Sequence, residues 1–246
     1  MEKLTFQEKI FYGFVCNEKR VYQHWYNRFL LCGVDYARIR RVVSRIKNWY
    51  LRCEERHKEG LILEERAEDL LKKGYHVTAK EMFHEAAACF HVGQHFFYID
   101  PQQKHKSLKR IHYNYTKSLS LYEKLKRPIR FDISFRGAKI PGYIRLQSEQ
   151  NRPLVIFVNG MDNVKEIEQH AFSSRFYNSG FNTLTFDGPS QGEMYSSMEM
   201  IPDWEVSVST IIDWLETIKL KDDEKNILYN IILQHNNYIL CPKIRR

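Results

Sequence analysis

Residues 154–194 constrain the fold more than any other part of the chain. Residues 154–158 are an unbroken run of leucine, β-branched and aromatic side chains, which predicts a strand buried on both faces. Helical spacing of apolar residues follows over about 163–179 and ends at a glycine. A second strand is predicted over 181–186. Strand, helix and strand in this order predict a βαβ unit with a right-handed crossover.

Each of these two strands runs into a glycine turn, Asn159-Gly160 after the first and Asp187-Gly188 after the second. In an open parallel sheet, ligands bind beyond the carboxyl ends of the strands, where both turns are expected. Tight connections alone would explain the glycines equally well. The spacing by itself therefore leaves two interpretations open, a simple turn and a part of a binding site.

The residues around both turns resemble the α/β-hydrolase superfamily. Within it they resemble the branch of 2,6-dihydroxypseudooxynicotine hydrolase, the fungal polyketide-shortening pigment hydrolases and the FrsA-like esterases. That branch shows GGxDxxKEE at the first turn and DGPGQGEM at the second, and in this chain Asn159 and Ser190 each replace a glycine of these patterns. A third pattern of the branch, GHxxSAxExxxRAxxYY, is matched in part over 74–91, and the resemblance covers about residues 45–225. The matching residues of the two turns are Gly160, Asp162, Lys165 and Glu166, and Asp187, Gly188, Pro189, Gln191, Gly192, Glu193 and Met194.

The resemblance implies a site at these turns. The turn at Gly160 and Met161 is expected to supply one backbone N–H of an oxyanion hole, with Met161 as the donor. Loss of such a donor typically lowers the rate by a factor of ~10²–10³. Asp162, Asp187 and Gly188 are expected beside the site. The resemblance implies neither a metal nor a cofactor.

The catalytic side chains of this superfamily are missing from their expected places. In relatives a nucleophile elbow, G-x-S-x-G, follows a helix that is predicted here over 203–219, and the acid and the histidine come after it. Gly192 is the last glycine of the chain, so no such elbow follows that helix. The segment 225–246 diverges from the family pattern, and the acid and base are expected past Arg246. We therefore assign no catalytic residue.

Three residues are poor substitutes for the missing side chains. Ser190 occupies the position of a glycine, but it lacks an elbow and an identifiable base. His235 and Asp222 have no predicted strand and turn that would place them at the edge of the sheet.

Three functional hypotheses follow. In the first, the chain is a fragment of an α/β-hydrolase for an ester or a ketone-type C–C bond of an aromatic or polyketide-like substrate, and it is inactive alone. In the second, it is one half of a split hydrolase that a second chain completes. In the third, it is a non-catalytic binding protein that uses its basic helical region. A small-molecule substrate and a homodimer are the partners that the resemblance implies. A complementing chain is instead suggested by the half-built sheet, whose last strand would expose an apolar edge for pairing.

The chain is expected to form two domains that meet near Pro128. Residues 1–127 form a helical cap region, and residues 128–246 form a partial α/β-hydrolase domain with the divergent tail 225–246. The predicted fold class is α/β, a helical cap followed by the first half of an α/β-hydrolase sheet, mostly parallel and with helices on both faces. Four helices are expected in the first domain. One covers 35–58 and ends at Gly60, a second covers 61–73, a third begins at a capping box of Thr78 and Glu81 and ends at Asp100, and a fourth covers 103–125. A β-hairpin is expected over 129–135 and 139–146.

The distribution of charge bears on whether the chain binds nucleic acid. Residues 1–130 contain 26 Lys and Arg against 15 Asp and Glu, and the densest basic stretch, 38–58, alternates with apolar residues at helical spacing. This pattern favours a solvated helix face, and without a known nucleic-acid motif we expect no nucleic-acid partner.

Five scattered cysteines indicate free thiols in a reducing cytoplasm. No apolar run approaches the ~20 residues of a membrane span.

Three histidines, His84, His91 and His95, are expected on one face of a helix. His91 and His95 are four residues apart, a spacing at which two histidines can share a metal ion. No acidic or cysteine ligand completes such a site at suitable spacing, so helix packing is the favoured interpretation. A role in a substrate pocket under the helical cap stays open for one of the three.

Overall fold

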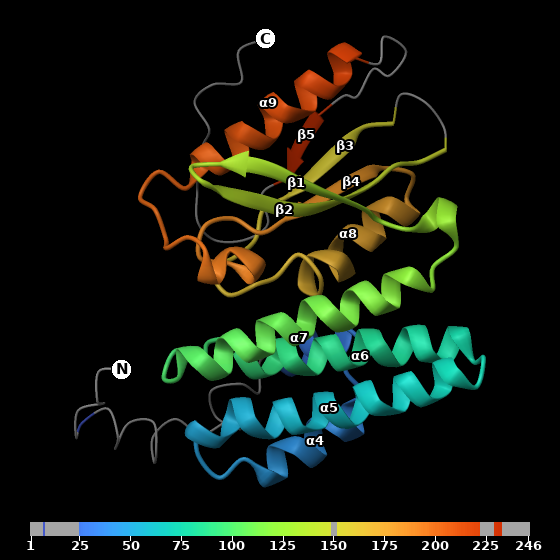
Figure 1. Cartoon of the computed structure of the whole chain (residues 1–246), viewed down its shortest axis with the longest axis vertical. Coiled ribbons are helices and arrows are strands. Elements are labelled where there is room, and N and C mark those ends of the chain that lie inside the picture. The colour runs from blue at the N-terminus through green and yellow to red at the C-terminus, as the bar shows by residue number, and fades with distance from the viewer. Residues whose placement is uncertain (1–6, 8–24, 149–151, 222–228, 233–246) are drawn as a thin grey trace. The chain divides into compact units, whose positions relative to one another are not determined.

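The computed structural model describes residue 7 and residues 25–148, 152–221 and 229–232. The chain divides into two compact units, Met1–Lys124 and Leu125–Arg246 (Figure 1). The first is helical, and the second contains a β-sheet covered by helices. Among the helices that the structure describes, none combines the length and the apolar character that a membrane crossing requires.

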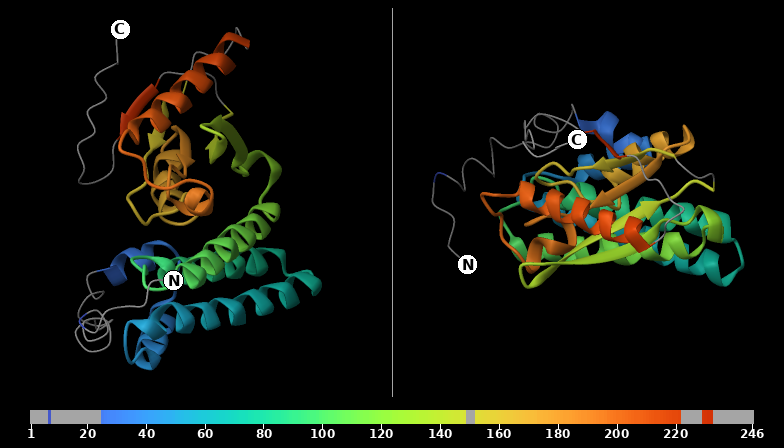
Figure 2. Two further views of the ribbon diagram at one scale, coloured as in Figure 1. Left: turned by 60° about the vertical axis from the view of Figure 1, so that its left-hand side comes forward. Right: turned by 90° about the horizontal axis from the view of Figure 1, so that it is seen from above.

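The first unit is built from helices joined by short connections. Figure 2 shows α5, α6 and α7 lying alongside one another, in agreement with the packing of α6 against both of its neighbours. The helical character predicted for this region is therefore confirmed. The helices are α3 Tyr26–Leu31, α4 Tyr36–Arg45, α5 Tyr50–Lys72, α6 His76–Gln94 and α7 Pro101–Ser120, and the 3₁₀-helix η3 Lys124–Lys126 follows them.

Helices α4 and α5 differ from their prediction. The single helix expected over 35–58 is interrupted at residues 46–49, and α5 continues through Gly60 without a break. Within the helix, position 60 requires a glycine because the ring of Phe90 packs directly on it. A Cβ atom there would lie 2.7 Å from that ring. The prediction of a helix end was wrong, since this glycine permits a close approach of α5 and α6.

Two predicted helix boundaries around α6 were also wrong. Helix α6 begins at His76, so Thr78 and Glu81 lie within the helix and form no capping box. Asp100 does not close α6 but begins α7, where its carboxylate accepts hydrogen bonds of 3.0 and 3.1 Å from two backbone N–H groups of the first turn. An aspartate followed by proline is a favourable helix start, because proline at N1 loses no hydrogen bond.

Several side chains of the basic stretch of α4 and α5 are engaged within the unit. The buried carboxylate of Glu59 accepts hydrogen bonds from three arginines of α4, namely Arg38, Arg41 and Arg45. Burial opposes the ionisation of Glu59, but these hydrogen bonds outweigh it and lower its pKa to about 2. Arg52 is fully buried and donates to three carbonyl oxygens at the carboxyl end of α6, at 2.5 to 3.1 Å. The face expected to be solvated is thus partly an internal ion cluster.

The second unit contains a five-stranded mixed sheet in the order β1-β2-β4-β3-β5. Strand β2 pairs antiparallel with β1 and with β4, whereas β3 pairs parallel with β4 and with β5. The sheet is therefore half antiparallel and not mostly parallel as predicted, because the entry hairpin joins the βαβ unit through an antiparallel edge. The strands are β1 Ile129–Phe135, β2 Ala138–Arg145, β3 Leu154–Phe157, β4 Asn182–Phe186 and β5 Tyr229–Ile232.

Helices α8 (Glu168–Asn178) and α9 (Glu205–Lys221) cover opposite faces of this sheet (Figure 1). Side chains alternate along each strand, so Ile156 and Leu184 join the core on the α9 side. Phe157 points to the other face, where its ring lies 5.3 Å from that of Phe176 in α8. The βαβ unit and the helices on both faces are confirmed.

The predicted hairpin between β1 and β2 is confirmed as well. Arg136 and Gly137 form its turn, with φ of +46° and +81°, as a two-residue turn of type I′ requires. The Arg136 guanidinium pairs with the carboxylate of Asp203 at the surface.

Strand β5 lies in the segment that was predicted to be a divergent tail. It pairs with β3 from Tyr229 beside Leu154 to Ile232 beside Phe157. The tail thus contributes to the sheet, which its apolar composition alone did not predict. Asp222 and His235, considered above as catalytic substitutes, lie outside the described residues.

Candidate functional site

The turns after β3 and β4 lie at one edge of the sheet. The two strands are parallel, with Phe157 beside Thr185, so both chains leave the sheet in the same direction. Strand β5 ends at this edge too, because Ile232 lies beside Phe157. Since ligands of open α/β sheets bind beyond this edge, we expect a ligand-binding site there.

The predicted site residues fall into an exposed and a buried group. The Met161 side chain is 63% exposed, and its backbone N–H donates no hydrogen bond to any residue that the structure describes. Gly160, before it, is partly exposed. Asp162 and Asp187 are buried, and Gly188 packs so closely against a tryptophan ring that a Cβ atom would lie 2.2 Å from it. The structure therefore brings the two turns together and leaves one backbone donor open.

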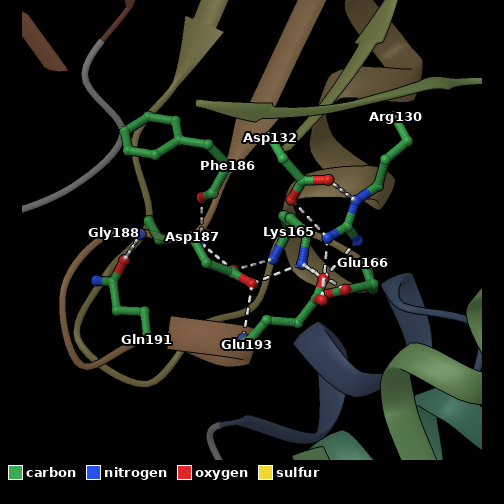
Figure 3. Close-up of polar contacts among 10 residues, drawn as sticks. Arg130, Asp132, Lys165, Glu166, Phe186, Asp187, Gly188, Gln191 and Glu193 are labelled. Carbon is green, nitrogen blue, oxygen red and sulfur yellow. Dashed lines mark hydrogen bonds and ion pairs between the residues drawn. The ribbon is translucent and has the colours of Figure 1, made fainter. Parts of the chain in front are cut away.

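A buried ion cluster connects the two turns (Figure 3). The ammonium nitrogen of Lys165 lies 2.7 Å from Asp187 Oδ2, 2.5 Å from Glu166 Oε1 and 2.6 Å from Glu193 Oε1. The side chains of Lys165 and Asp187 have no exposed surface. Arg130 of β1 donates to both oxygens of Glu193, at 2.6 and 3.1 Å. The cluster thus joins β1 to both motif segments.

The charges of this cluster are unequal, because two buried carboxylates, Asp187 and Glu166, surround one buried ammonium group. Burial alone would lower the pKa of Lys165, but the carboxylates outweigh it and raise that pKa well above its usual value. Burial raises the pKa of Asp187 to about 6, with Lys165 opposing the shift and Glu166 adding to it. Lys165 therefore stays charged, and Asp187 takes up a proton near pH 6.

Each carboxylate oxygen of Asp187 accepts two hydrogen bonds. Oδ1 accepts from the backbone N–H of Lys165 at 2.9 Å and from Asn159 Nδ2 at 3.0 Å. Oδ2 accepts from Lys165 Nζ at 2.7 Å and from the backbone N–H of Glu193 at 3.1 Å. Gly192 leaves room for this carboxylate, because a Cβ atom there would lie 2.0 Å from Oδ2. The aspartate and the last glycine of the second motif are thus required together.

Two side-chain amides hold the turn after β3. Asn159 Nδ2 also donates to the carbonyl oxygen of Phe186, at 2.8 Å. Gln191 Nε2 donates to the carbonyl oxygen of Gly160 at 3.0 Å. Gln191 Oε1 accepts from the N–H of Gly188 at 3.1 Å (Figure 3). The turns after β3 and β4 are therefore bound to each other at two points.

Sequence reasoning assigned no role to four of these residues, Lys165, Gln191, Glu193 and Arg130. The first three occupy matching positions of the two motifs, which was a signal that they belong to the site. Arg130 belongs to no motif, and only the pairing of β1 with β2 brings it to the cluster.

Ser190 lies in a pentapeptide that fits G-x-S-x-G, a match that sequence reasoning missed. It has a φ of +65° and follows a strand, as a nucleophile elbow would, but the turn leads into the 3₁₀-helix η4 (Gly192–Ser196). Its hydroxyl makes no hydrogen bond to any described residue. The N–H of Gln191, the expected oxyanion donor, is bound to the carbonyl oxygen of Gly188 at 3.0 Å. Among the described residues the Ser190 hydroxyl therefore has no hydrogen-bonded base, and the N–H of Gln191 is not free to act as its oxyanion donor.

The three histidines of α6 and its carboxyl end pack inside the helical unit. The His95 ring contacts Trp25 and Phe96 edge-on, with centroids 4.8 and 4.7 Å away. The His91 ring lies 5.4 Å from that of His95, and both residues are buried. The ring of His84 lies 6.2 Å from that of a tyrosine in α7. These contacts favour a packing role within this unit.

Comparison with known proteins gives the family. No protein-family model matches the chain. The 2,6-dihydropseudooxynicotine hydrolase of Paenarthrobacter nicotinovorans is 27% identical over 212 residues, which cover 82% of this chain and 54% of that protein. The α/β hydrolase ucsC of an Acremonium species is 25% identical over 232 residues, which cover 82% of this chain and 47% of that protein. The crystal structure of the 2,6-dihydroxy-pseudo-oxynicotine hydrolase superimposes with a TM-score of 0.68 and 25% identity, over 85% of this chain and 57% of that one.

The chain is thus similar to α/β-hydrolases both in sequence and in fold. The resemblance inferred from the two motifs is thereby confirmed, together with the α/β fold class. The chain spans about half the length of the curated relatives it matches. In α/β-hydrolases the oxyanion hole takes one N–H from the nucleophile elbow and one from the loop after the third strand.

Proposed function

We propose that this chain supplies the oxyanion turn of a serine-type α/β-hydrolase. Its substrate would be an ester or a ketone-type C–C bond in an aromatic or polyketide-like small molecule, the substrate class that the family resemblance implies. The backbone N–H of Met161 carries this proposal. It belongs to the loop between β3 and α8, at the ligand-binding edge, and it has no acceptor among the described residues.

The chemistry proposed for this N–H is charge stabilisation. When a nucleophile attacks a carbonyl carbon, the electron pair of the C=O double bond moves to oxygen and forms an oxyanion. A donor that already points at this oxygen lowers the barrier without reorganising, and one such donor is worth a factor of ~10²–10³ in rate.

The nucleophile is proposed to come from outside residues 1–246. No G-x-S-x-G follows Gly192 within these residues, and Ser190 has no base among the described residues. We therefore infer that residues 1–246 alone do not hydrolyse esters and that a complementing segment, for which a second chain is one source, completes the site. A homodimer is the other assembly that the resemblance implies, and a cytoplasmic location agrees with the buried free thiols of Cys32, Cys53 and Cys89.

A nucleic-acid-binding role is the weaker alternative. It depends on the basic helices, but several of their arginines are engaged inside the helical unit. Glu59 binds three of them, and Arg52 is fully buried at the carboxyl end of α6. Salt-sensitive retention of the chain on nucleic acid would favour this alternative.

A complementation assay tests the proposal. The full chain is mixed with the carboxyl-terminal half of the Paenarthrobacter relative, and hydrolysis of p-nitrophenyl acetate is followed. We expect turnover by the mixture and none above background by either part alone. Turnover by this chain alone would overturn the proposal that it needs a partner.

Two variants of Met161 test the oxyanion donor itself. Met161→Pro removes the N–H without breaking a hydrogen bond to any described residue, and Met161 is not among the residues with positive φ. Met161→Ala keeps the N–H and changes only an exposed side chain. We expect Met161→Pro to lower kcat/KM of the complemented enzyme by about 10²–10³-fold and Met161→Ala to leave it nearly unchanged. Equal effects of the two would show that the N–H is not the donor.

A further inference from the structure

The carbonyl of Gly160 and the N–H of Met161 belong to the same peptide group. A trans peptide is planar, so its C=O and its N–H point in opposite directions. The described residues contain no cis peptide bond. Whatever holds the Gly160 oxygen therefore also sets the direction of the Met161 N–H.

Two donors hold the Gly160 oxygen. The Gln191 side chain donates from Nε2 at 3.0 Å, and the backbone N–H of Asn163 donates at 3.1 Å. The second bond closes the local turn, whereas the first comes from the other motif, 31 residues later. Gln191 is thus the contact that ties this peptide group to β4.

The orientation of the Gln191 amide follows from its two partners. Gly188 can only donate to it through a backbone N–H, and Gly160 can only accept through a carbonyl oxygen. In the reverse orientation, Nε2 of Gln191 would face the N–H of Gly188 and Oε1 would face the carbonyl oxygen of Gly160. A donor would then meet a donor and an acceptor would meet an acceptor. The amide nitrogen must therefore face Gly160.

Gln191 is itself held in place. Only 3% of its surface is exposed, and its backbone N–H is bound to the carbonyl oxygen of Gly188. The next two residues are anchored at Asp187, where Gly192 makes room for the carboxylate and Glu193 donates to it. A rigidly supported donor fixes its acceptor far better than a mobile one.

We propose that Gln191 is a positioning residue that aims the Met161 N–H at the substrate carbonyl oxygen. Its hydrogen bond to the Gly160 oxygen also polarises the shared peptide group, which makes the N–H a better donor. The functional meaning of this contact depends on the proposed hydrolase function, but the contact and its effect on the peptide group do not. This assigns a role to the glutamine of the second motif.

Amide NMR on the ¹⁵N-labelled full chain tests the positioning role without any activity. Gln191→Ala removes both hydrogen bonds, and Gln191→Glu keeps an acceptor for Gly188 while losing the donor to Gly160. We expect both variants to broaden or split the Met161 amide resonance and to raise the hydrogen-exchange rate of the Asn163 amide about five- to tenfold.

Gln147→Ala is the matched control. Gln147 Nε2 also binds two carbonyl oxygens, those of Tyr177 and Phe181, at 2.6 and 3.2 Å, but beside the opposite end of β4. This variant should leave Met161 and Asn163 unchanged within about twofold. If Gln191→Ala fails to fold, the Gln191→Glu spectrum decides. Wild-type-like Met161 and Asn163 amides in a folded Gln191 variant would overturn the positioning role.

The complementation assay separates this inference from the proposed function. An inactive mixture with perturbed amides in the Gln191 variants would refute the hydrolase proposal and leave the contact established. In an active mixture, we expect Gln191→Glu to lower kcat about tenfold or more with little change in KM, because the donor acts only on the transition state.

Discussion

The ammonium group of Lys165 lies 2.7 Å from the carboxylate of Asp187, and neither side chain has exposed surface. Lys165 lies after β3 and Asp187 directly follows β4, so the pair joins the two motif segments at the edge of the sheet. Removing one partner of a buried pair leaves the other charge without compensation, which costs far more than breaking a pair in water. The lysine and the aspartate of the motifs therefore act first as a structural link.

We predict that Lys165→Met strongly destabilises the second unit. Three carboxylates would lose their shared cation, and the expected loss in unfolding free energy is about 3–5 kcal/mol. Hydrogen exchange of the β3 and β4 amides measures this loss in the unit concerned. Lys139→Met is the control, because it makes the same change at an exposed position of β2. A loss as small as that of the control would mean that the cluster contributes little.

We predict a pH dependence from the same cluster. The pKa of Asp187 in the folded state, about 6, lies above the ordinary 3.8, so proton binding favours the folded state. The stability this group contributes is complete below about pH 4 and is lost as the pH rises through 6, by up to about 3 kcal/mol.

The ¹³Cγ chemical shift of Asp187 measures this titration directly, with an expected midpoint near pH 6. Asp203 is the internal control, because the hydrogen bond from Arg136 lowers its pKa below 3.8. A midpoint for Asp187 below that of Asp203 would contradict the prediction.

The sequence predicted those parts of the fold whose signals are local. A run of β-branched residues, or a turn such as Arg136-Gly137, specifies its own conformation. Strand β5 was missed because a segment of only four residues, Tyr229–Ile232, becomes a strand only by pairing with β3. Gly60 was misinterpreted for the same reason, since the ring that explains it belongs to another helix.

The site shows the same division between local and distant signals. The motifs located both turns, but Lys165 and Asp187 are 22 residues apart, and the register of β3 and β4 decides that they meet. Gln191 and Gly160, 31 residues apart, meet for the same reason. Motif positions therefore indicated which residues matter, and only the tertiary structure showed what each one contacts.

We predict that Ser190→Gly stabilises the second unit. Ser190 has a φ of +65°, in the left-handed region that a glycine adopts without strain, and its hydroxyl makes no hydrogen bond to any described residue. The expected gain in unfolding free energy is about 1 kcal/mol, measured by urea unfolding followed by fluorescence. Ser197→Gly is the control, because it makes the same change at a negative φ of −110° and should not stabilise. Abolished ester hydrolysis in a folded Ser190→Gly variant would instead identify Ser190 as a nucleophile.

The last prediction concerns the ion cluster of the helical unit. Glu59→Gln keeps an acceptor for the arginines of α4 but removes the charge that neutralises them, and it should lower the unfolding free energy by about 2 kcal/mol at pH 7. The lowered pKa of Glu59, about 2, means that its contribution is present above pH 4.5 and is lost as the pH falls towards 2. The difference between Glu59→Gln and the wild type should therefore shrink over this range, as measured by hydrogen exchange of the α4 and α5 amides. Glu54→Gln is the control, because Glu54 is half exposed and, among the described residues, forms an ion pair only with Lys58 one turn away, so its loss should cost less than about 0.5 kcal/mol. An equal loss of unfolding free energy in both variants at pH 7 would show that burial does not increase the contribution of the Glu59 cluster to stability.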